Sequence, residues 1–522
     1  MSQPPVPPPP QGRPPQQPVP YQPHLPPHPF SPQAPPASAY PSSVPPQPPY
    51  PPAPSGPGGS GGGRRRLAVL VGSALAALLV IGAGTVFALR DSGEPQADGK
   101  PGDAATSPSS SPTPTSIEAR ELFRVEAPDL SGYEFLETPR MGGSWVTSRI
   151  YASGAENAVT GHHVATGKPA WTVDLPGTLC RASRDVNRAG LVAVIFKPSN
   201  VYKESDRANT YCTRLAVIDV NKGAKLWEEQ LDESVARGWG LSVAISDTVA
   251  AVGWPGGSLA YQASTGASVW DAPTKGCTYE EHLGGRQLLT LGYCQTPAGK
   301  RFRVGQRDER TGKTDWTYDL PKVHGAWMIS SKPLVLGVMR SEDGLDADQL
   351  LTISEQGTVQ STIDLGDDYI PGCGPNRSTC NATVVTGHTA YLPSDPHALA
   401  ASNKITAFDL RTGKPARTFD ATKYATWVPV RADGDALIAI ERPGAARPAR
   451  VLRLGPDTGQ AEILLRMPRG HFINRALGGM IDKDGGDLVL YEEGRLFLHT
   501  AYISSNEATR RKELLTVAYT NR

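Results

Sequence analysis

Short runs in which apolar and polar residues alternate recur throughout the C-terminal four-fifths of the chain. Three of them are RLAVIDV (residues 214–220), KITAFDL (residues 404–410) and PAWTVDL (residues 169–175). An alternation with a period of two is typical of β-strands that bury one face. Other apolar runs, such as LVAVIFK and DALIAIE, precede them and predict further hairpins. The pattern predicts an all-β structure with four strands in each repeating stretch.

A glycine followed four residues later by a tryptophan marks the turn between two of these runs. The four copies are Gly167 with Trp171, Gly223 with Trp227, Gly266 with Trp270, and Gly312 with Trp316, and weaker copies follow at Gly357, Gly413 and Gly459. Successive glycines lie 43 to 56 residues apart, and such a period is typical of propellers and solenoids. We expect the glycine to accept a positive φ in a hairpin turn and the tryptophan to pack between neighbouring propeller blades.

Seven blades end in this glycine motif, and an eighth is expected at residues 485–502, a segment that lacks an outermost strand. Residues 121–130 (ELFRVEAPDL) are typical of an isolated outermost strand. Pairing that strand with the last blade closes the ring and hides two open sheet edges. The sequence therefore predicts an eight-bladed β-propeller over residues 119–505, with seven blades as the alternative, and a C-terminal extension at residues 506–522.

The repeat resembles the pyrroloquinoline quinone (PQQ)-like β-propeller repeat. ITAFDLRTGKPA (residues 405–416) and LAVIDVNKGAKLW (residues 215–227) match that repeat best, and the Ala/Gly/Pro/Arg-rich bias is similar to that of actinobacterial proteins. The resemblance implies a fold but no single function, because the repeat occurs in enzymes and in non-enzymatic scaffolds. Quinone-dependent dehydrogenases with this repeat carry adjacent cysteines, and this chain has no Cys-Cys pair. We therefore expect no catalysis, no PQQ, no calcium and no other metal.

An apolar segment of 23 residues without a charge, from Leu67 to Leu89, precedes the repeats. As a helix it would extend about 35 Å, enough to cross a hydrocarbon core of about 30 Å. Arg64, Arg65 and Arg66 flank its N-terminal side, and the positive-inside rule places that side in the cytoplasm. We expect a single-pass anchor at residues 64–90 in the plasma membrane, rather than a cleaved signal peptide, with the propeller outside the cytoplasm.

The segments on either side of this anchor are low in complexity. Residues 1–63 hold 26 of the 51 prolines and one charged side chain, which predicts a disordered cytoplasmic tail. Its P-x-x-P spacings leave two roles open, a spacer or a ligand for a cytoplasmic partner. Residues 91–118 predict a flexible linker. Residues 91–522 carry 47 basic and 51 acidic side chains, and the resulting net charge of −4 argues against nucleic acid as a partner.

All six cysteines follow the anchor, where an oxidising compartment favours disulfides. Of fifteen possible pairings, the blade arrangement selects Cys180 with Cys212, Cys277 with Cys294, and Cys373 with Cys380. All three pairs are expected on one face of the ring, the face that also carries the longest insertions. Aromatic residues are expected to begin four innermost strands at that face: Trp239, Trp327, Trp427 and Phe472. Two interpretations stay open for them, a core that fills the central channel or a rim that binds a protein, peptide or glycan.

These observations favour a non-catalytic binding or assembly scaffold of the cell envelope, built on a membrane-tethered propeller. A transmembrane sensor that signals through the Pro-rich tail is one alternative. A quinone-dependent dehydrogenase is the other. No motif in the sequence identifies the ligand.

Overall fold

The structure, a computed structural model, describes most of the chain after residue 115. The described residues are 116–127, 142–199, 211–236, 241–273, 277–297, 299–342, 344, 346–373, 380–395, 402–444, 447–455, 460–470, 473–474, 477, 488–500 and 514–522. Within these ranges no helix is long and apolar enough to span a bilayer. The predicted tail, the predicted anchor with Arg64, Arg65 and Arg66, and the linker up to residue 115 lie outside the described residues.

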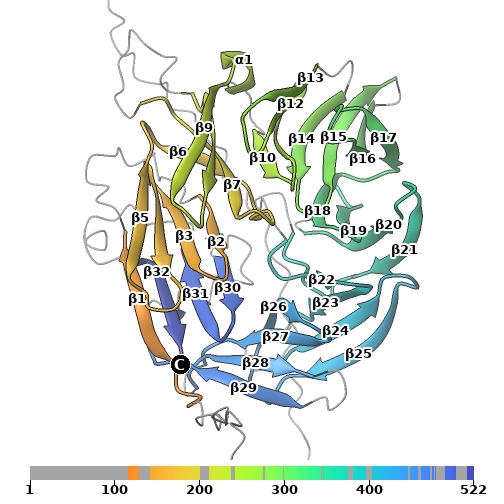
Figure 1. The fold of residues 1–522 in the computed structure, drawn as a ribbon. Coiled ribbons are helices and arrows are strands. Elements are labelled where there is room, and N and C mark those ends of the chain that lie inside the picture. Colours follow the sequence, from red (N-terminus) through yellow and green to blue (C-terminus); the bar gives the residue numbers. More distant parts are fainter. Residues whose placement is uncertain are drawn as a thin grey trace, which may run out of the picture. The chain divides into compact units, whose positions relative to one another are not determined.

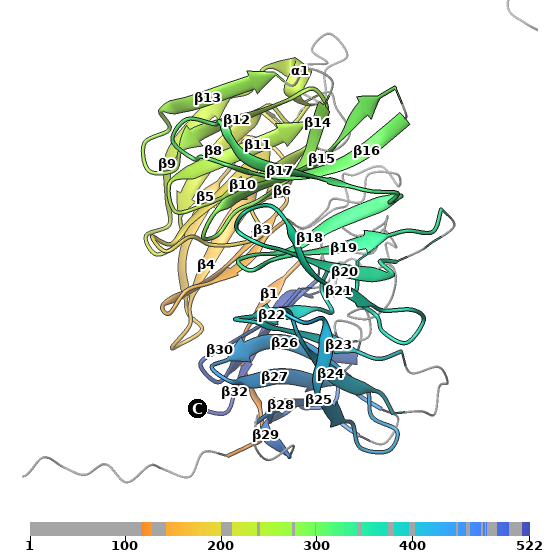
Figure 2. The same cartoon turned by 90° about the vertical axis from the view of Figure 1, so that its right-hand side faces the viewer.

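Eight antiparallel sheets of four strands each surround a central axis as blades (Figure 1, Figure 2). Blade 1 contains β2 (Ser144–Val146), β3 (Ile150–Ala155), β4 (Ala158–His163) and β5 (Pro169–Asp174). Blade 2 contains β6 (Leu179–Ala182), β7 (Leu191–Phe196), β8 (Arg214–Asp219) and β9 (Ala224–Gln230). Blade 3 follows the short helix α1 (Glu233–Ala236) and contains β10 (Ser242–Ile245), β11 (Val249–Trp254), β12 (Gly257–Gln262) and β13 (Ser268–Pro273).

The remaining blades repeat this order from the axis outward. Blade 4 contains β14 (Cys277–Leu283), β15 (Leu288–Thr296), β16 (Gly299–Arg307) and β17 (Thr314–Leu320). Blade 5 contains β18 (Gly325–Ser331), β19 (Leu334–Met339), β20 (Gln349–Ile353) and β21 (Val359–Asp364). Blade 6 contains β22 (Val384–Thr386), β23 (Thr389–Pro393), β24 (Lys404–Asp409) and β25 (Lys414–Asp420). Blade 7 contains β26 (Trp427–Asp433), β27 (Ala436–Glu441), β28 (Arg450–Leu454) and β29 (Ala461–Arg466).

Blade 8 is built from both ends of the described chain. It contains β30 (Leu488–Glu492), β31 (Arg495–His499) and β32 (Leu514–Thr520), and its outermost strand is β1 (Arg120–Glu126). The predicted eight blades and the predicted closure by an N-terminal strand are therefore confirmed, and the seven-blade alternative is wrong. The predicted boundary at residue 505 is also wrong. β32 belongs to the last blade because its alternating sequence LLTVAYT supplies the strand with which β1 pairs.

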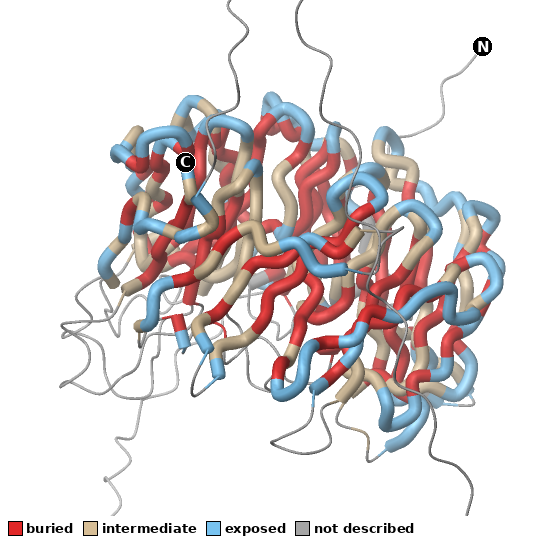
Figure 3. Tube along the Cα trace, turned by 90° about the horizontal axis from the view of Figure 1, so that it is seen from below, coloured by how far each residue is buried: buried red, intermediate tan, exposed pale blue. Residues whose placement is uncertain are grey.

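The hydrophobic core lies between the blades rather than within them. At the junction of blades 2 and 3, for example, Ile195 and Val217 of one sheet pack against Ile245 and Val252 of the next, and all four are fully or almost fully buried. Each of the eight junctions has its own buried apolar cluster of this kind. Figure 3 shows buried residues along the strands and exposed residues at the turns. A single blade buries neither face alone, which is why the repeat has to close into a ring.

The recurrent glycine and tryptophan meet across the junctions of blades 1 to 5. Gly223 has a φ of 66°, and a Cβ atom built on it would lie 2.1 Å from Cγ of Trp171, which belongs to the preceding blade. Three more contacts of this type follow: Gly266 with Trp227, Gly312 with Trp270, and Gly357 with Trp316. Each tryptophan on an outermost strand therefore packs on the turn of the next blade, where only glycine leaves room for the ring.

Candidate functional site

Two faces of the ring differ in how the strands are connected. The turn face carries the short turns between the first and second strands and between the third and fourth strands of each blade. The loop face carries the connections between blades and between the second and third strands. Much of the loop face lies outside the described residues, whereas the turn face is described almost completely.

Two predicted disulfides on the loop face are confirmed. The Cys180–Cys212 bridge ties β6 to the loop that precedes β8, with 6.2 Å between the Cα atoms. The Cys373–Cys380 bridge closes a short loop before β22. Cys294 is disulfide-bonded and lies opposite Cys277 in the register of β14 and β15, while the side chain of Cys277 lies outside the described residues.

The predicted aromatic rim is not what the structure shows for Trp427. This residue is 3% exposed, and its indole N–H donates to Oε2 of the buried Glu441 at 3.0 Å. The backbone N–H of Trp427 donates to Oδ1 of Asn403. The rim interpretation is therefore wrong for Trp427, because its indole N–H is hydrogen-bonded and its ring is buried inside the protein.

Of the other three predicted rim residues, one is partly buried and two lie outside the described residues. Trp327 in β18 is partly buried against the apolar cluster that contains both Cys373 and Cys380. Trp239 and Phe472 lie outside the described residues.

An exposed aromatic side chain does occur on the loop face, three residues before Trp427. Tyr424 lies in the loop between β25 and β26, is 59% exposed and has a positive φ of 64°. The Lys423 ammonium lies 4.9 Å from the centre of the Tyr424 ring. Sequence reasoning missed Tyr424 because it sits outside the alternating strand pattern. Its position between a strand end and Trp427 was the available signal.

The central channel contains a cavity of about 420 Å³ near the turn face. The first strands of blades 4 to 7, and the turn that follows β6 in blade 2, supply its walls. Four cationic side chains line this cavity, Arg184, Arg286, Lys332 and Arg431, together with a single carboxylate, Asp185. We call this the channel cavity.

Arg184 bonds to a blade that is not its neighbour in the ring. It lies in the turn after β6, and its Nη1 donates to the carbonyl oxygen of Ile329 in β18, at 3.1 Å. Blades 2 and 5 are three positions apart, so this side chain crosses the channel. Arg286 extends from the turn after β14, is exposed, and forms no hydrogen bond or ion pair with any residue that the structure describes.

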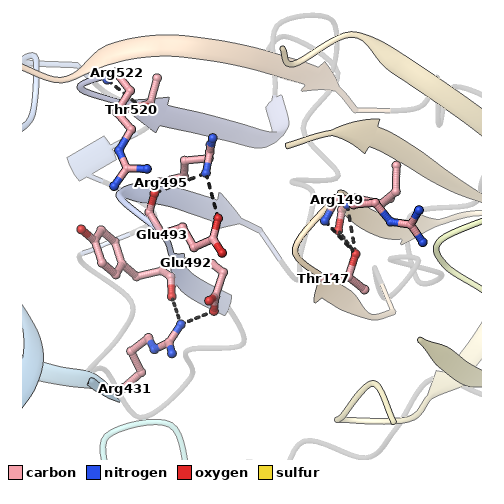
Figure 4. Close-up of polar contacts among 10 residues, drawn as sticks. Thr147, Arg149, Arg431, Glu492, Glu493, Arg495, Thr520 and Arg522 are labelled. Carbon is pink, nitrogen blue, oxygen red and sulfur yellow. Dashed lines mark hydrogen bonds and ion pairs between the residues drawn. The ribbon is translucent and has the colours of Figure 1, made fainter. Parts of the chain in front are cut away.

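The other two cations are neutralised by glutamates. Nη1 of Arg431 donates to the carbonyl oxygen of Tyr491 at 2.8 Å and pairs with the carboxylate of Glu492 (Figure 4). Nζ of Lys332 lies 2.9 Å from Oε1 of Glu355. The channel cavity therefore combines two paired cations with the two guanidinium groups of Arg184 and Arg286.

These cations follow a pattern that the sequence shows but that sequence reasoning missed. A basic residue lies within three residues of the end of the innermost strand in blades 2, 4, 5 and 7, within ASRD, GGRQ, SSKP and PVRAD. Because these strand ends converge on the axis, basic residues near them gather in one place. Aligning the blades by strand, rather than by the glycine turn, would have revealed the cluster.

Buried histidines elsewhere in the ring have strongly lowered pKa values. Burial, with a smaller contribution from Arg307, lowers the pKa of His282 to about 3, and its Nε2 lies 2.8 Å from Oγ of Ser258. Burial lowers the pKa of His499 to about 4, and its Nδ1 lies 2.9 Å from Oγ1 of Thr516. Both rings are enclosed between blades and are neutral at physiological pH, which gives them a packing role.

Across the described part of the chain, no cluster of three or more His, Cys, Asp or Glu side chains is placed to hold a metal ion. The channel cavity in particular offers four cations and one carboxylate. Calcium requires six to eight oxygen ligands with compensating negative charge. The residues of this cavity therefore do not fit the calcium ion that quinone-dependent dehydrogenases of this type would bring.

The fold and the repeat together define an eight-bladed β-propeller built from PQQ-like repeats. The chain matches the family model described as the outer membrane protein assembly factor BamB, over residues 120–283 and again over residues 212–337. The predicted resemblance to PQQ-like repeat proteins is thereby confirmed. No curated protein matches the chain.

Solved structures with a similar fold come from several kinds of protein. BamB from Moraxella catarrhalis is 15% identical, with a TM-score of 0.39 over 74% of this chain and 96% of that chain. Sqt1 from Saccharomyces cerevisiae is 10% identical, with a TM-score of 0.44 over 77% and 99%. The quinohemoprotein alcohol dehydrogenase from Comamonas testosteroni is 12% identical, with a TM-score of 0.44 over 78% and 77%. At these identities the likeness concerns the fold alone.

Proposed function

We propose that this protein is a non-catalytic binding or assembly scaffold of the cell envelope, tethered through residues 64–90 and presenting its loop face to a protein partner. The observation that carries the proposal is the construction of that face. The Cys180–Cys212 disulfide fastens one of its loops to β6, and the Cys373–Cys380 disulfide closes another loop on itself, on a ring that is closed by strand pairing. Loops held on a rigid framework lose little conformational freedom on binding, which favours recognition.

Three further points support this proposal. Tyr424 exposes an aromatic ring on the same face, and exposed tyrosines are enriched among residues that dominate binding energy. Structural disulfides are typical of proteins outside the cytoplasm. The matching family model is described as an assembly factor.

Site-specific photocrosslinking in the organism's own cells tests the proposal. A photoreactive phenylalanine analogue replaces Tyr424 on the loop face, and the matched control replaces the exposed Gln356 on the turn face of blade 5. We expect a discrete crosslinked protein from position 424 and none from position 356. No crosslink from position 424, or the same product from both positions, would contradict the proposal.

A second measurement addresses the enzymatic alternative. The purified full-length protein is incubated with PQQ and calcium, and its thermal unfolding and absorbance spectrum are recorded. We expect no change in either, because the donors of the channel cavity do not suit a divalent cation. A saturable thermal shift that requires both additives would favour the dehydrogenase alternative instead.

A further inference from the structure

We infer that the channel cavity is a binding site for a small oxyanion, that is, a ligand bearing a carboxylate or phosphate group. This site lies near the turn face and is independent of the partner that we place on the loop face. It is formed by five blades together, and no single blade contributes more than one of its four cations. The site therefore exists only when the ring is assembled.

The first argument is that two guanidinium groups have hydrogen-bond donors that no described residue uses. Arg184 gives one of its five N–H donors to the carbonyl oxygen of Ile329, which holds the group across the channel and leaves its other donors available. Arg286 has no hydrogen bond or ion pair with a described residue. Guanidinium groups match the planar oxygens of carboxylates and phosphates and bind them through paired hydrogen bonds.

The second argument is the charge around the cavity. Lys332 and Arg431 already have glutamate partners, so their charges are balanced before any ligand binds. The cavity then holds two further guanidinium groups against one carboxylate, that of Asp185. An anion relieves the excess positive charge inside a partly enclosed space, whereas a cation would add to it.

The third argument is size and lining. A volume of about 420 Å³ lies at the lower end of the range for small-molecule sites, about 300 to 1,000 Å³. Besides the charged groups, the walls present hydroxyl groups from Ser330 and Thr383 and apolar side chains such as Val384 and Val430. The cavity therefore suits a compact organic or inorganic oxyanion rather than a polymer.

The test measures binding to the full-length protein at constant ionic strength. Inorganic phosphate and citrate are titrated separately against sodium chloride, and the thermal unfolding midpoint is followed. We expect a saturable increase with at least one of the two anions. The anion that binds more tightly distinguishes a phosphate ligand from a carboxylate ligand. Absence of saturation with both would overturn the inference.

Three variants locate the binding. The double variant Arg184→Gln/Arg286→Gln should weaken binding by at least about tenfold, because it removes both unbalanced guanidinium groups. Arg310→Gln removes one charge from an exposed turn of blade 4 outside the cavity and should leave binding unchanged. Equal binding by the double variant and the wild type, or equal weakening by Arg310→Gln, would overturn the inference.

The single variant Arg286→Lys guards against a folding defect. It keeps the charge on an exposed turn and removes only the planar fork. We expect an intermediate affinity with an unchanged unfolding midpoint in the absence of ligand. If Arg286→Lys binds as tightly as the wild type, recognition by paired hydrogen bonds is wrong. Because this binding does not involve Tyr424, its failure would leave the crosslinking result of the proposed function unaffected.

Discussion

The four successive junctions from blade 1 to blade 5 and the junction that closes the ring, between blades 8 and 1, are packed by different contacts. In the first group, one device is repeated: a tryptophan on an outermost strand rests on a glycine turn of the next blade. At the closing junction between blades 8 and 1, the glycine of the repeat, Gly167, faces the backbone carbonyl of Leu122 in β1 instead. Among the residues that the structure describes, no tryptophan belongs to the apolar cluster of that junction.

The closing junction is held by aromatic stacking and a buried polar chain. Phe123 of β1 stacks on His162 with 4.6 Å between ring centres, and Tyr151 stacks on Phe497 at the same separation. The Tyr151 hydroxyl lies 3.2 Å from Oγ1 of Thr516, which in turn contacts His499. Burial raises the pKa of Tyr151 to about 12, so the Tyr151 hydroxyl in this row of hydrogen-bonded side chains is uncharged at neutral pH.

The absence of a tryptophan is not peculiar to the closing junction, because Gly413 at the junction of blades 5 and 6 likewise faces a backbone carbonyl, that of Thr362. What distinguishes the closing junction is chain connectivity. Between blades 1 and 5 the partners are joined by a continuous chain, so a modest contact is sufficient to fix the next blade. At the closing junction no turn joins β32 to β1, and the ends of the chain have to find each other. We infer that individual, non-repeated side chains provide the specificity there, which the following three predictions examine.

Removal of the closing strand should have the largest effect. Deleting residues 116–127 removes β1 and the segment that bonds to Arg466 of blade 7. It exposes the edge of β32, and we expect loss of a single cooperative unfolding transition. Chemical denaturation followed by circular dichroism measures this. Deleting residues 1–60 serves as the control and should leave the transition in place. An unchanged midpoint after deletion of β1 would show that the ring does not need its closing strand.

Substitution of a seam glycine should have the next largest effect. Gly312 has a φ of 68°, and an added Cβ would lie 2.4 Å from Cγ of Trp270. We expect Gly312→Ala to lower the free energy of unfolding by about 3 kcal/mol, from backbone strain and displacement of the ring together. Gly434 has a φ of 60° and open space around the same position. Gly434→Ala should therefore cost only about 1 kcal/mol. Equal losses in urea denaturation would mean that the tryptophan contact does not restrict the turn.

Acidification should have the smallest effect and should act partly through the closing junction. The pKa of His499 is about 4 in the folded protein and about 6.5 when unfolded. Its stabilising contribution is complete above pH 6.5, decreases as the pH falls, and is lost near pH 4. Between pH 7 and pH 5 this amounts to about 2 kcal/mol.

The variant His499→Gln isolates that contribution. Because His282 has a lowered pKa too, the wild type loses stability from both groups over this range. We expect the difference in free energy of unfolding between pH 7 and pH 5 to be about 2 kcal/mol smaller in His499→Gln than in the wild type. An identical pH dependence in both proteins would show that His499 is not the titrating group.

The features that could be predicted from the sequence are those that repeat. Gly223 and Trp171 recur in register, so the blades, their turns and even the closing strand near Phe123 were accessible from pattern alone. β32 was missed because a long stretch of sequence separates it from β31 and because no glycine turn follows it in the sequence. The bridge between Cys373 and Cys380 was predictable because only seven positions separate the two residues, in the loop before β22.

The parts that could not be predicted depend on the direction in which a side chain points. Trp427 begins an innermost strand as expected, yet its indole turns inward to Glu441, while Tyr424 nearby points to solvent. The channel cavity depends on five strand ends meeting at one axis. Arg184 and Arg286 are 102 positions apart in the sequence, and neither belongs to the glycine motif, so only the closed ring shows that they share a site.

The order in which the ring is synthesised adds a consequence. Arg120 at the start of β1 bonds to the backbone of Arg522, a partner 402 positions later in the chain. At a translation rate of about 5–20 residues per second, β1 waits roughly 20–80 s before its partner strand exists. Throughout that interval the edge of β1 that later pairs with β32 is open. An open strand edge is a template for pairing with other chains, so the nascent protein is exposed to aggregation until its last strand is made.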